Sequence, residues 1–135
     1  MSEEEFIAKA RAENRKVSRK HCVEIGRWIK NDSVEKAKEK LKKVINKEKP
    51  VPYTKFNKDL SHKKGMAAGR YPVKSAKEML KILKSAEENG KYEGLSDMKV
   101  SNVVVTQGRR MRTPKRQRGR SPKSAHINIE VKEIK

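Results

Sequence analysis

The segment from Gly108 to Lys123 most strongly limits what this chain can fold into. Eight of its sixteen residues are arginine or lysine, none is acidic, and Met111 is its only large apolar side chain. Such a segment cannot pack into a protein core, because a buried charge without a partner is strongly unfavourable. We therefore expect it to form the far end of a two-stranded ribbon. Its basic residues are Arg109, Arg110, Arg112, Lys115, Arg116, Arg118, Arg120 and Lys123.

Two interpretations of this basic tip (residues 108–123) are open. The simpler one is a solvated charged loop. The other is a segment that becomes ordered against nucleic acid, where arginine binds phosphate bidentately and stacks on bases. Arginine dominates over lysine in the tip, whereas lysine dominates in the rest of the chain. Solvation alone does not select arginine, so we favour the second interpretation.

The overall composition agrees with a polyanionic partner. Lysine and arginine number 36 against 17 acidic residues, which gives a formal net charge of +19, and only 33% of the residues are hydrophobic. A chain of 135 residues with this composition is expected to form a single small domain (1–135) with a small core. No apolar run approaches the ~18 residues of a membrane span. There is also little material to line a large apolar pocket, so no small-molecule substrate is expected.

Apolar residues at helical spacing predict a first helix from Arg19 to Lys30. Ser18 is placed as its N-cap, and Val17 is placed to pack on Cys22 one turn later. The apolar face of this helix contains Cys22, Ile25, Gly26 and Ile29.

Two further helices are predicted. One begins where Asp32 and Glu35 have the spacing of a capping box, and it ends before Pro50. The other has Pro72 as its first helical residue and extends to about Asn89. The stretch 49–71 between them has no periodic pattern and is long for a connection, which is typical of a functional or mobile loop.

Period-two patterns predict strands near both ends of the chain. Residues 6–11 alternate weakly and form either a short strand or a frayed helix. Residues 98–106 and the last nine residues read as two strands of a hairpin. The predicted fold class is α+β: a small domain of three α-helices packed on a short antiparallel sheet, with a long protruding β-hairpin near the C-terminus. We expect 6–97 to be mostly globular and 98–134 to be the hairpin, whose arm from Met98 to Pro114 would reach roughly 50 Å.

Catalytic and metal-binding patterns are absent from the sequence. The single cysteine, Cys22, excludes an intramolecular disulfide, fits a reducing compartment and shares the apolar face of its helix. His21, His62 and His126 lack metal-ligand spacing, and we expect a structural role for His126. We expect no enzyme activity, no cofactor and no metal. The acidic N-terminus does not resemble an export signal, so a cytoplasmic location is expected.

Four motifs resemble the large-subunit ribosomal protein twenty-two family of the archaeal and eukaryotic type. The most specific is Gly69-Arg-Tyr-Pro-Val-Lys-Ser-Ala-Lys77. The start of the first helix, residues 17–25, also matches the family, as do Lys49–Tyr53 followed by Phe56-Asn57. The return arm of the hairpin matches through 114–120 and His126-Ile127. The resemblance extends from about Ala8 to Val131.

The resemblance implies a structural constituent of the large ribosomal subunit that binds ribosomal RNA and neighbouring ribosomal proteins. It also implies a hairpin that contributes to the wall of the polypeptide exit tunnel, where its tip meets the nascent polypeptide. The tunnel-facing tip would be Arg110, Met111, Arg112, Thr113 and Pro114. The expected RNA-binding residues are the eight basic residues of the tip together with Arg19, Lys20, His21, Lys55, Lys63, Lys64, Arg70, Lys74 and Lys77.

One departure and three alternatives stand beside this resemblance. The connection Ser121–Ala125 is shorter than in the family pattern, and Gln117 replaces a small residue, so we expect a shortened hairpin. Tyr53, Phe56 and Tyr71 are candidates either to stack on bases or to pack over the core. A DNA-compacting architectural protein is the alternative function. An RNA-modifying enzyme is the third, although no cofactor fingerprint supports it.

Overall fold

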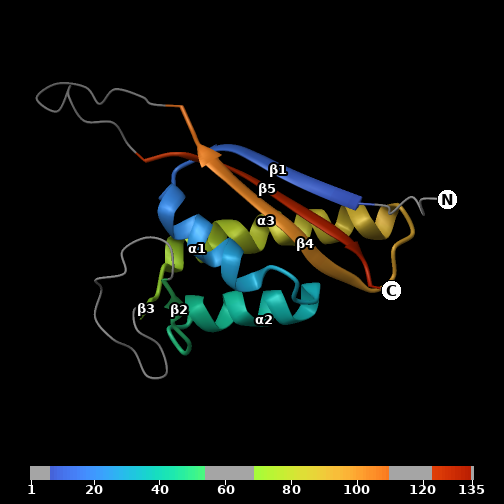
Figure 1. The fold of residues 1–135 in the computed structure, drawn as a ribbon, viewed down its shortest axis with the longest axis horizontal. Helices are drawn as coiled ribbons and strands as arrows, with labels where there is room; N and C mark the ends of the chain where they lie inside the picture. The colour runs from blue at the N-terminus through green and yellow to red at the C-terminus, as the bar shows by residue number, and fades with distance from the viewer. Residues whose placement is uncertain (1–6, 54–68, 110–122, 135) are drawn as a thin grey trace, which may run out of the picture.

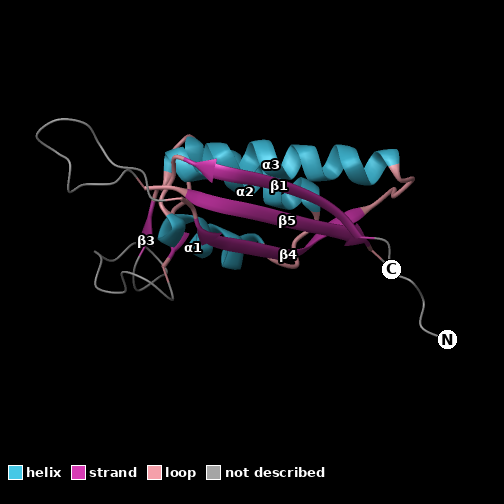
Figure 2. Ribbon diagram, turned by 90° about the horizontal axis from the view of Figure 1, so that it is seen from above, coloured by secondary structure: helices cyan, strands magenta, loops and turns pink. Residues whose placement is uncertain are grey.

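The computed structural model describes residues 7–53, 69–109 and 123–134. Two helices cover one face of a three-stranded antiparallel sheet, and a third helix packs beside them (Figures 1 and 2). This arrangement confirms the predicted α+β class. The elements are β1 (Ile7–Arg15), α1 (Arg19–Ile29), α2 (Val34–Ile45), β2 (Val51–Pro52), β3 (Gly69–Arg70), α3 (Val73–Tyr92), β4 (Met98–Gln107) and β5 (Ala125–Glu133).

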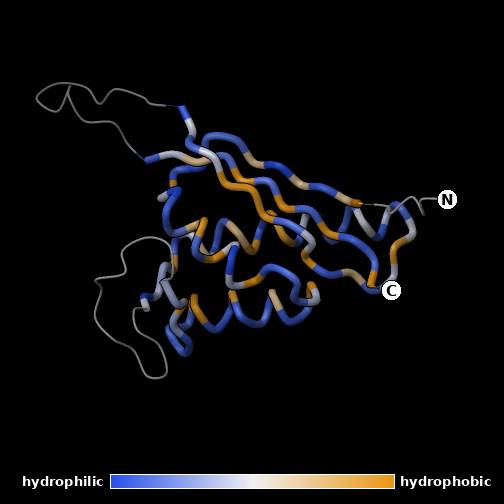
Figure 3. Tube along the Cα trace, viewed as in Figure 1, coloured by the Kyte–Doolittle hydropathy of each residue, from blue (hydrophilic) through white to orange (hydrophobic). Residues whose placement is uncertain are grey.

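The sheet has the strand order β1-β5-β4, so the last strand of the chain is the central one. Strand β1 buries Ala8, Ala10 and Ala12 opposite Val131, Ile129 and Ile127 of β5. The resulting alternation of apolar and polar positions is visible along the strands (Figure 3). The strand expected at residues 6–11 is therefore confirmed and the frayed helix is wrong. The strand extends to Arg15 because its pairing with β5 continues past Arg11.

Strand β4 contains a bulge that changes which of its positions face the core. The pairing with β5 shifts between Val100 and Asn102, and the Ser101 hydroxyl donates to the Glu130 carbonyl at 3.0 Å. A bulge inserts one residue and so changes which positions face the core. Val100 is fully buried before the bulge, while Val103 packs against the core after it.

The two strands of the predicted hairpin pair as expected. Their register extends to Gln107 opposite Ala125, and the amide of Gly108 donates to the Ser124 carbonyl at 3.0 Å. However, both strands belong to the sheet, and α1 packs on β4. A free arm measured from Met98 therefore overstates the length that can extend away from the helices. Residues 110–122, which include most of the basic tip, lie outside the described residues.

The helix ends differ from the predicted ones at their caps. Ser33, and not Asp32, caps α2 by accepting from the amide of Lys36 at 3.3 Å. The Asp32 carboxylate instead binds the Lys40 ammonium at 2.5 Å. Pro72 is the N-cap of α3 and not its first helical residue. Helix α3 continues to Tyr92, past the predicted end at Asn89.

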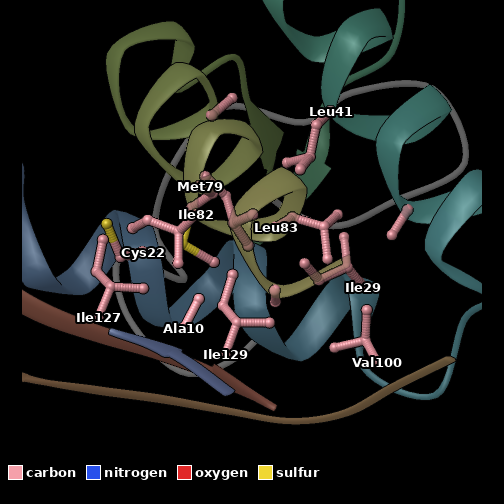
Figure 4. Packing of buried hydrophobic residues seen from close by; sticks show 14 of the residues in the cluster. Ala10, Cys22, Ile29, Leu41, Met79, Ile82, Leu83, Val100, Ile127 and Ile129 are labelled. Atoms are coloured by element: carbon pink, nitrogen blue, oxygen red, sulfur yellow. The ribbon is translucent and has the colours of Figure 1, made fainter. Parts of the chain in front are cut away.

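The core lies between the helices and the sheet (Figure 4). Cys22, Ile29, Leu83 and Ile129 have no exposed surface, which confirms Cys22 as a core residue. Tyr53 is only 3% exposed and belongs to the same cluster, so it packs over the core as one of its two interpretations required.

Candidate nucleic-acid interface

One end of the domain gathers segments that are far apart in the sequence. The first turns of α1 and α3, the β2–β3 pair and the ends of β4 and β5 that lead to the tip all lie there (Figure 1). The start of β1 and the end of β5 lie at the opposite end (Figure 2). We call the first end the basic end, since it contains Lys16, Lys47, Arg70, Lys74 and Lys123.

The long loop 49–71 is closed at its base by two short strands. Val51 pairs with Arg70, and Pro52 pairs with Gly69. This pairing holds Arg70, which is exposed, next to the start of α3. The predicted contacts Lys55, Lys63 and Lys64, and Phe56, lie outside the described residues.

Helices α1 and α3 both begin at this end and direct the positive ends of their dipoles toward it. Neither α1 nor α3 has an acidic residue in its first turn, and the Ser18 side chain makes no cap hydrogen bond. The N-terminus of a helix carries a partial positive charge, which acidic residues usually offset. Here lysines and arginines follow instead, so the helix ends add to the side-chain charge.

His21 lies at the centre of the basic end. It is half-buried, and its Nδ1 contacts the hydroxyl of Tyr53 with the two rings 5.6 Å apart. Burial, followed by the charges of Lys123 and Arg70, lowers the pKa of His21 below its ordinary value. Burial also raises the pKa of Tyr53 to about 12. Both rings are therefore neutral at pH 7, and each fixes the position of the other.

Two hollows open on either side of His21 and Pro72, which belong to both. The larger hollow has a volume of about 510 Å³, and the smaller about 360 Å³. The larger is lined by Lys16, Val17, Ser18, His21, Pro72, Val73, Lys74, Ser75 and Lys123. The smaller is lined by His21, Lys47, Tyr53, Arg70, Tyr71 and Pro72. None of these described lining residues is acidic.

The structure brings together four of the predicted contact residues: His21, Arg70, Lys74 and Lys123. Lys77 is exposed one turn further along α3. Arg19 and Lys20 lie in the first turn of α1, and Lys20 is exposed. Arg109 is exposed at the end of β4. The predicted contacts Arg110, Arg112, Lys115, Arg116, Arg118 and Arg120, and the tip residues Met111, Thr113 and Pro114, lie outside the described residues.

Two residues of the basic end were not predicted from the sequence. Lys16 precedes the first helix, and Lys47 follows the second with a left-handed backbone at φ 58°. Neither belongs to a motif. The only available signal for Lys16 was its position next to Val17 at the start of a basic helix.

The base of the hairpin is tied to β1 through Asn14. The Asn14 side-chain oxygen accepts from the backbone amide of Arg109 at 2.9 Å, and the backbone amide of Asn14 donates to His126 Nδ1 at 3.1 Å. The Ser124 hydroxyl donates to the Arg109 carbonyl at 2.7 Å. The structural role expected for His126 is confirmed by this contact. These bonds tie the adjoining ends of β4 and β5 to the end of β1.

Other chemistry is sparse in the part of the chain that the structure describes. No group of three or more potential metal ligands occurs there. Cys22 is a free, buried thiol, and burial raises its pKa to about 11. No helix within the described ranges has both the length and the apolar character needed to cross a membrane.

The fold and its basic end define a small, strongly cationic α+β protein. The family model described as ribosomal protein L22p/L17e matches residues 10–132. A large ribosomal subunit protein uL22 from Methanoculleus marisnigri is 36% identical over 96% of this chain and 90% of its own length. The uL22 of Methanococcoides burtonii is 39% identical over 94% and 88%, and that of Methanosphaera stadtmanae is 43% identical over 78% and 71%.

The chain therefore belongs to the ribosomal protein L22p/L17e family, as the sequence motifs predicted. Membership makes it a structural constituent of the large ribosomal subunit and not an enzyme, and it confirms the expected cytoplasmic location. The relatives compared above are archaeal, in agreement with the archaeal and eukaryotic type that the motifs resemble.

Proposed function

We propose that this chain binds ribosomal RNA of the large subunit through its basic end. The observation that carries the proposal is the meeting of cations from separate segments around His21. Lys16, Lys47, Arg70, Lys74 and Lys123 come from five places in the chain, and no described lining residue of either hollow is acidic.

The opposite end of the domain provides the contrast. A hollow there is lined by Glu35, Glu87 and Asp97, and its described lining contains no lysine or arginine. Glu87 is paired with Lys38 and Lys91, so the carboxylates make this end less cationic than the basic end. A polyanion approaching the protein is therefore attracted most strongly to the basic end.

Affinity and placement would come from different contacts. Lysines and arginines that neutralise phosphates supply affinity, which depends on salt because counterions are released. Placement comes from the shape of the folded RNA and from contacts with unstacked bases. The rigid spacing of Arg70, Lys74 and Lys77 on β3 and α3 suits a defined phosphate arrangement.

We further propose that the hairpin tip, Arg110–Pro114, contributes to the wall of the polypeptide exit tunnel and meets the nascent chain. The family membership and the ties of Asn14, Ser124 and His126 at the base of the hairpin support this proposal. A tip that must reach a fixed place needs a base whose direction is set by the body of the protein.

RNA binding is tested by the salt dependence of affinity for large-subunit ribosomal RNA. The triple variant Arg70→Ala/Lys74→Ala/Lys77→Ala should bind more weakly, with a slope of log K against log salt that is smaller by about one for each lost phosphate contact. The matched control removes the same charge through Lys9→Ala/Lys36→Ala/Lys91→Ala. Each of these lysines lies within 4.0 Å of a carboxylate.

Equal slopes for the two triple variants would contradict the proposed interface. Duplex DNA of the same charge is the second ligand in this experiment. Equal affinity for structured RNA and duplex DNA would favour the DNA-compacting alternative instead.

The tunnel proposal is tested with the variant Met111→Cys in assembled ribosomes. Since Cys22 is buried, the new thiol is the reactive one, and it should form crosslinks to a stalled nascent chain. A cysteine at Tyr92, which is 93% exposed on the body of the protein, serves as the control. Equal crosslinking from both positions, or from neither, would contradict a tunnel-facing tip.

A further inference from the structure

The larger hollow of the basic end has walls that differ from its rim. Val17, Pro72 and Val73 supply an apolar lining between the starts of α1 and α3. Its volume of about 510 Å³ is within the range of cavities that hold small organic ligands. A site that contacts only phosphates needs no apolar walls, because phosphates are bound by cations and hydrogen-bond donors.

The rim of the hollow carries three cations. Lys16, Lys74 and Lys123 are all exposed, and they come from the end of β1, the first turn of α3 and the start of β5. The carboxylate of Glu78, one turn beyond Lys74, is 3.9 Å from the guanidinium of Arg15. The rim therefore attracts an anionic group, while the apolar walls favour a group without charge.

His21 forms one wall and has a fixed orientation. Its contact with the Tyr53 hydroxyl holds the ring, and the buried Tyr53 cannot follow it outward. A neutral aromatic ring in a constant orientation is a surface on which a flat heterocycle can stack.

We propose that this hollow takes a single unstacked nucleotide of the ribosomal RNA, with its base against His21, Val73 and Pro72 and its flanking phosphates on the three lysines. A nucleotide combines the two chemistries that the hollow presents, since its base is flat and uncharged and its phosphates are anionic. The inference rests on the proposed RNA binding and specifies what one part of that interface recognises.

The test fills the hollow without changing charge. In the variant Val73→Phe, a larger side chain occupies the space proposed for the base. The variant Ser18→Phe fills the hollow from the other wall, and its cost to α1 is small because the Ser18 side chain makes no cap hydrogen bond. The matched control is Ile7→Phe, a partly exposed aliphatic residue at the start of β1, which lies at the opposite end of the domain (Figure 1).

Affinity is measured for large-subunit ribosomal RNA transcribed with 4-thiouridine. Either filled variant should raise the Kd about 5- to 150-fold, the range for losing one stacked base. The slope of log K against log salt should stay unchanged, because no phosphate contact is removed. In the wild type, ultraviolet light should crosslink the modified base to peptides that contain His21 or Val73. Filling the hollow should abolish that crosslink.

Three results would overturn the inference. One is a Kd within twofold of the Ile7→Phe control for both filled variants. Another is a crosslink that survives in both. The third is that the filled variants lose binding to a labelled hexaglutamate peptide while their affinity for RNA is unchanged. That result would make the occupant of the hollow an acidic protein segment. If the wild type bound no RNA, the proposed function itself would fail, and this outcome is distinct from all three.

Discussion

Gly26 of α1 lies directly against Val103 of β4. A Cβ added at position 26 would be 2.8 Å from Val103 Cγ1, closer than side chains pack. The helix and the strand can therefore approach only because position 26 has no side chain.

Replacing Gly26 with alanine should destabilise the protein despite the better helix propensity of alanine. The propensity gain is about 1 kcal/mol, whereas overpacking costs about 1–3 kcal/mol, so the free energy of unfolding should fall by up to about 2 kcal/mol. Urea denaturation measures this change. The double variant Gly26→Ala/Val103→Ala restores the space, and a gain over Val103→Ala alone is expected. Additive losses would show that the contact does not limit the packing.

The stability of the free protein should depend on His21 as the pH falls. Burial and the neighbouring cations lower the pKa of His21 below its ordinary value of 6.5. Between the lowered pKa and 6.5, the unfolded chain binds more protons than the folded one. The free energy of unfolding therefore decreases as the pH is lowered through that window. Thermal melts between pH 7.5 and 5.5 should show a smaller decrease for His21→Gln than for wild type. Parallel curves would exclude this contribution.

Asn14 should stabilise the base of the hairpin in two ways. It has a left-handed backbone at φ 51°, and its side chain accepts from the amide of Arg109. Asn14→Ala should lower the free energy of unfolding by about 1–3 kcal/mol through strain and the lost hydrogen bond. Hydrogen exchange of the Arg109 amide should become faster.

Two further variants separate these contributions. Asn14→Gly keeps the backbone conformation but loses the acceptor, and Asn14→Asp keeps both. Exchange of the Arg109 amide should be fast in the first and slow in the second. Similar exchange in both would contradict the role of the side chain.

The thiol of Cys22 should be almost unreactive in the folded protein. Burial raises its pKa to about 11, so about one thiol in a thousand is ionised at pH 8. Labelling with a disulfide reagent at pH 8 should be at least 100-fold slower, to order of magnitude, in native buffer than in guanidinium chloride. A cysteine introduced at the exposed Tyr92 is the control and should react at once. Rapid native labelling of Cys22 would contradict its burial.

The helices could be predicted from the sequence because their stripes are unambiguous. Cys22, Ile25 and Ile29 all occupy the buried face that their spacing indicates. The caps were harder, since Asp32 and Ser33 are both good capping residues. The tertiary pairing of Asp32 with Lys40 left the cap to Ser33, and a local pattern does not contain that contact.

The strands were less predictable for a related reason. Strand β1 buries only alanines, whose apolar signal is weak, so its length depends on pairing with β5. Strands β2 and β3 have two residues each and are defined only by each other. The meeting of Lys16, Lys47 and Lys123 around His21 likewise depends on the folded chain, although Arg70 and Lys74 were found from their motif.

The strand order β1-β5-β4 has a consequence for biosynthesis. Ile7 pairs with Lys132, and Met98 pairs with Glu133, so both outer strands must wait for residues 125–133 before they gain a neighbour. Contacts this distant in sequence form slowly, and unpaired strands are prone to aggregate while they wait. The sheet of a newly made chain therefore stays unpaired until residues 125–133 are available.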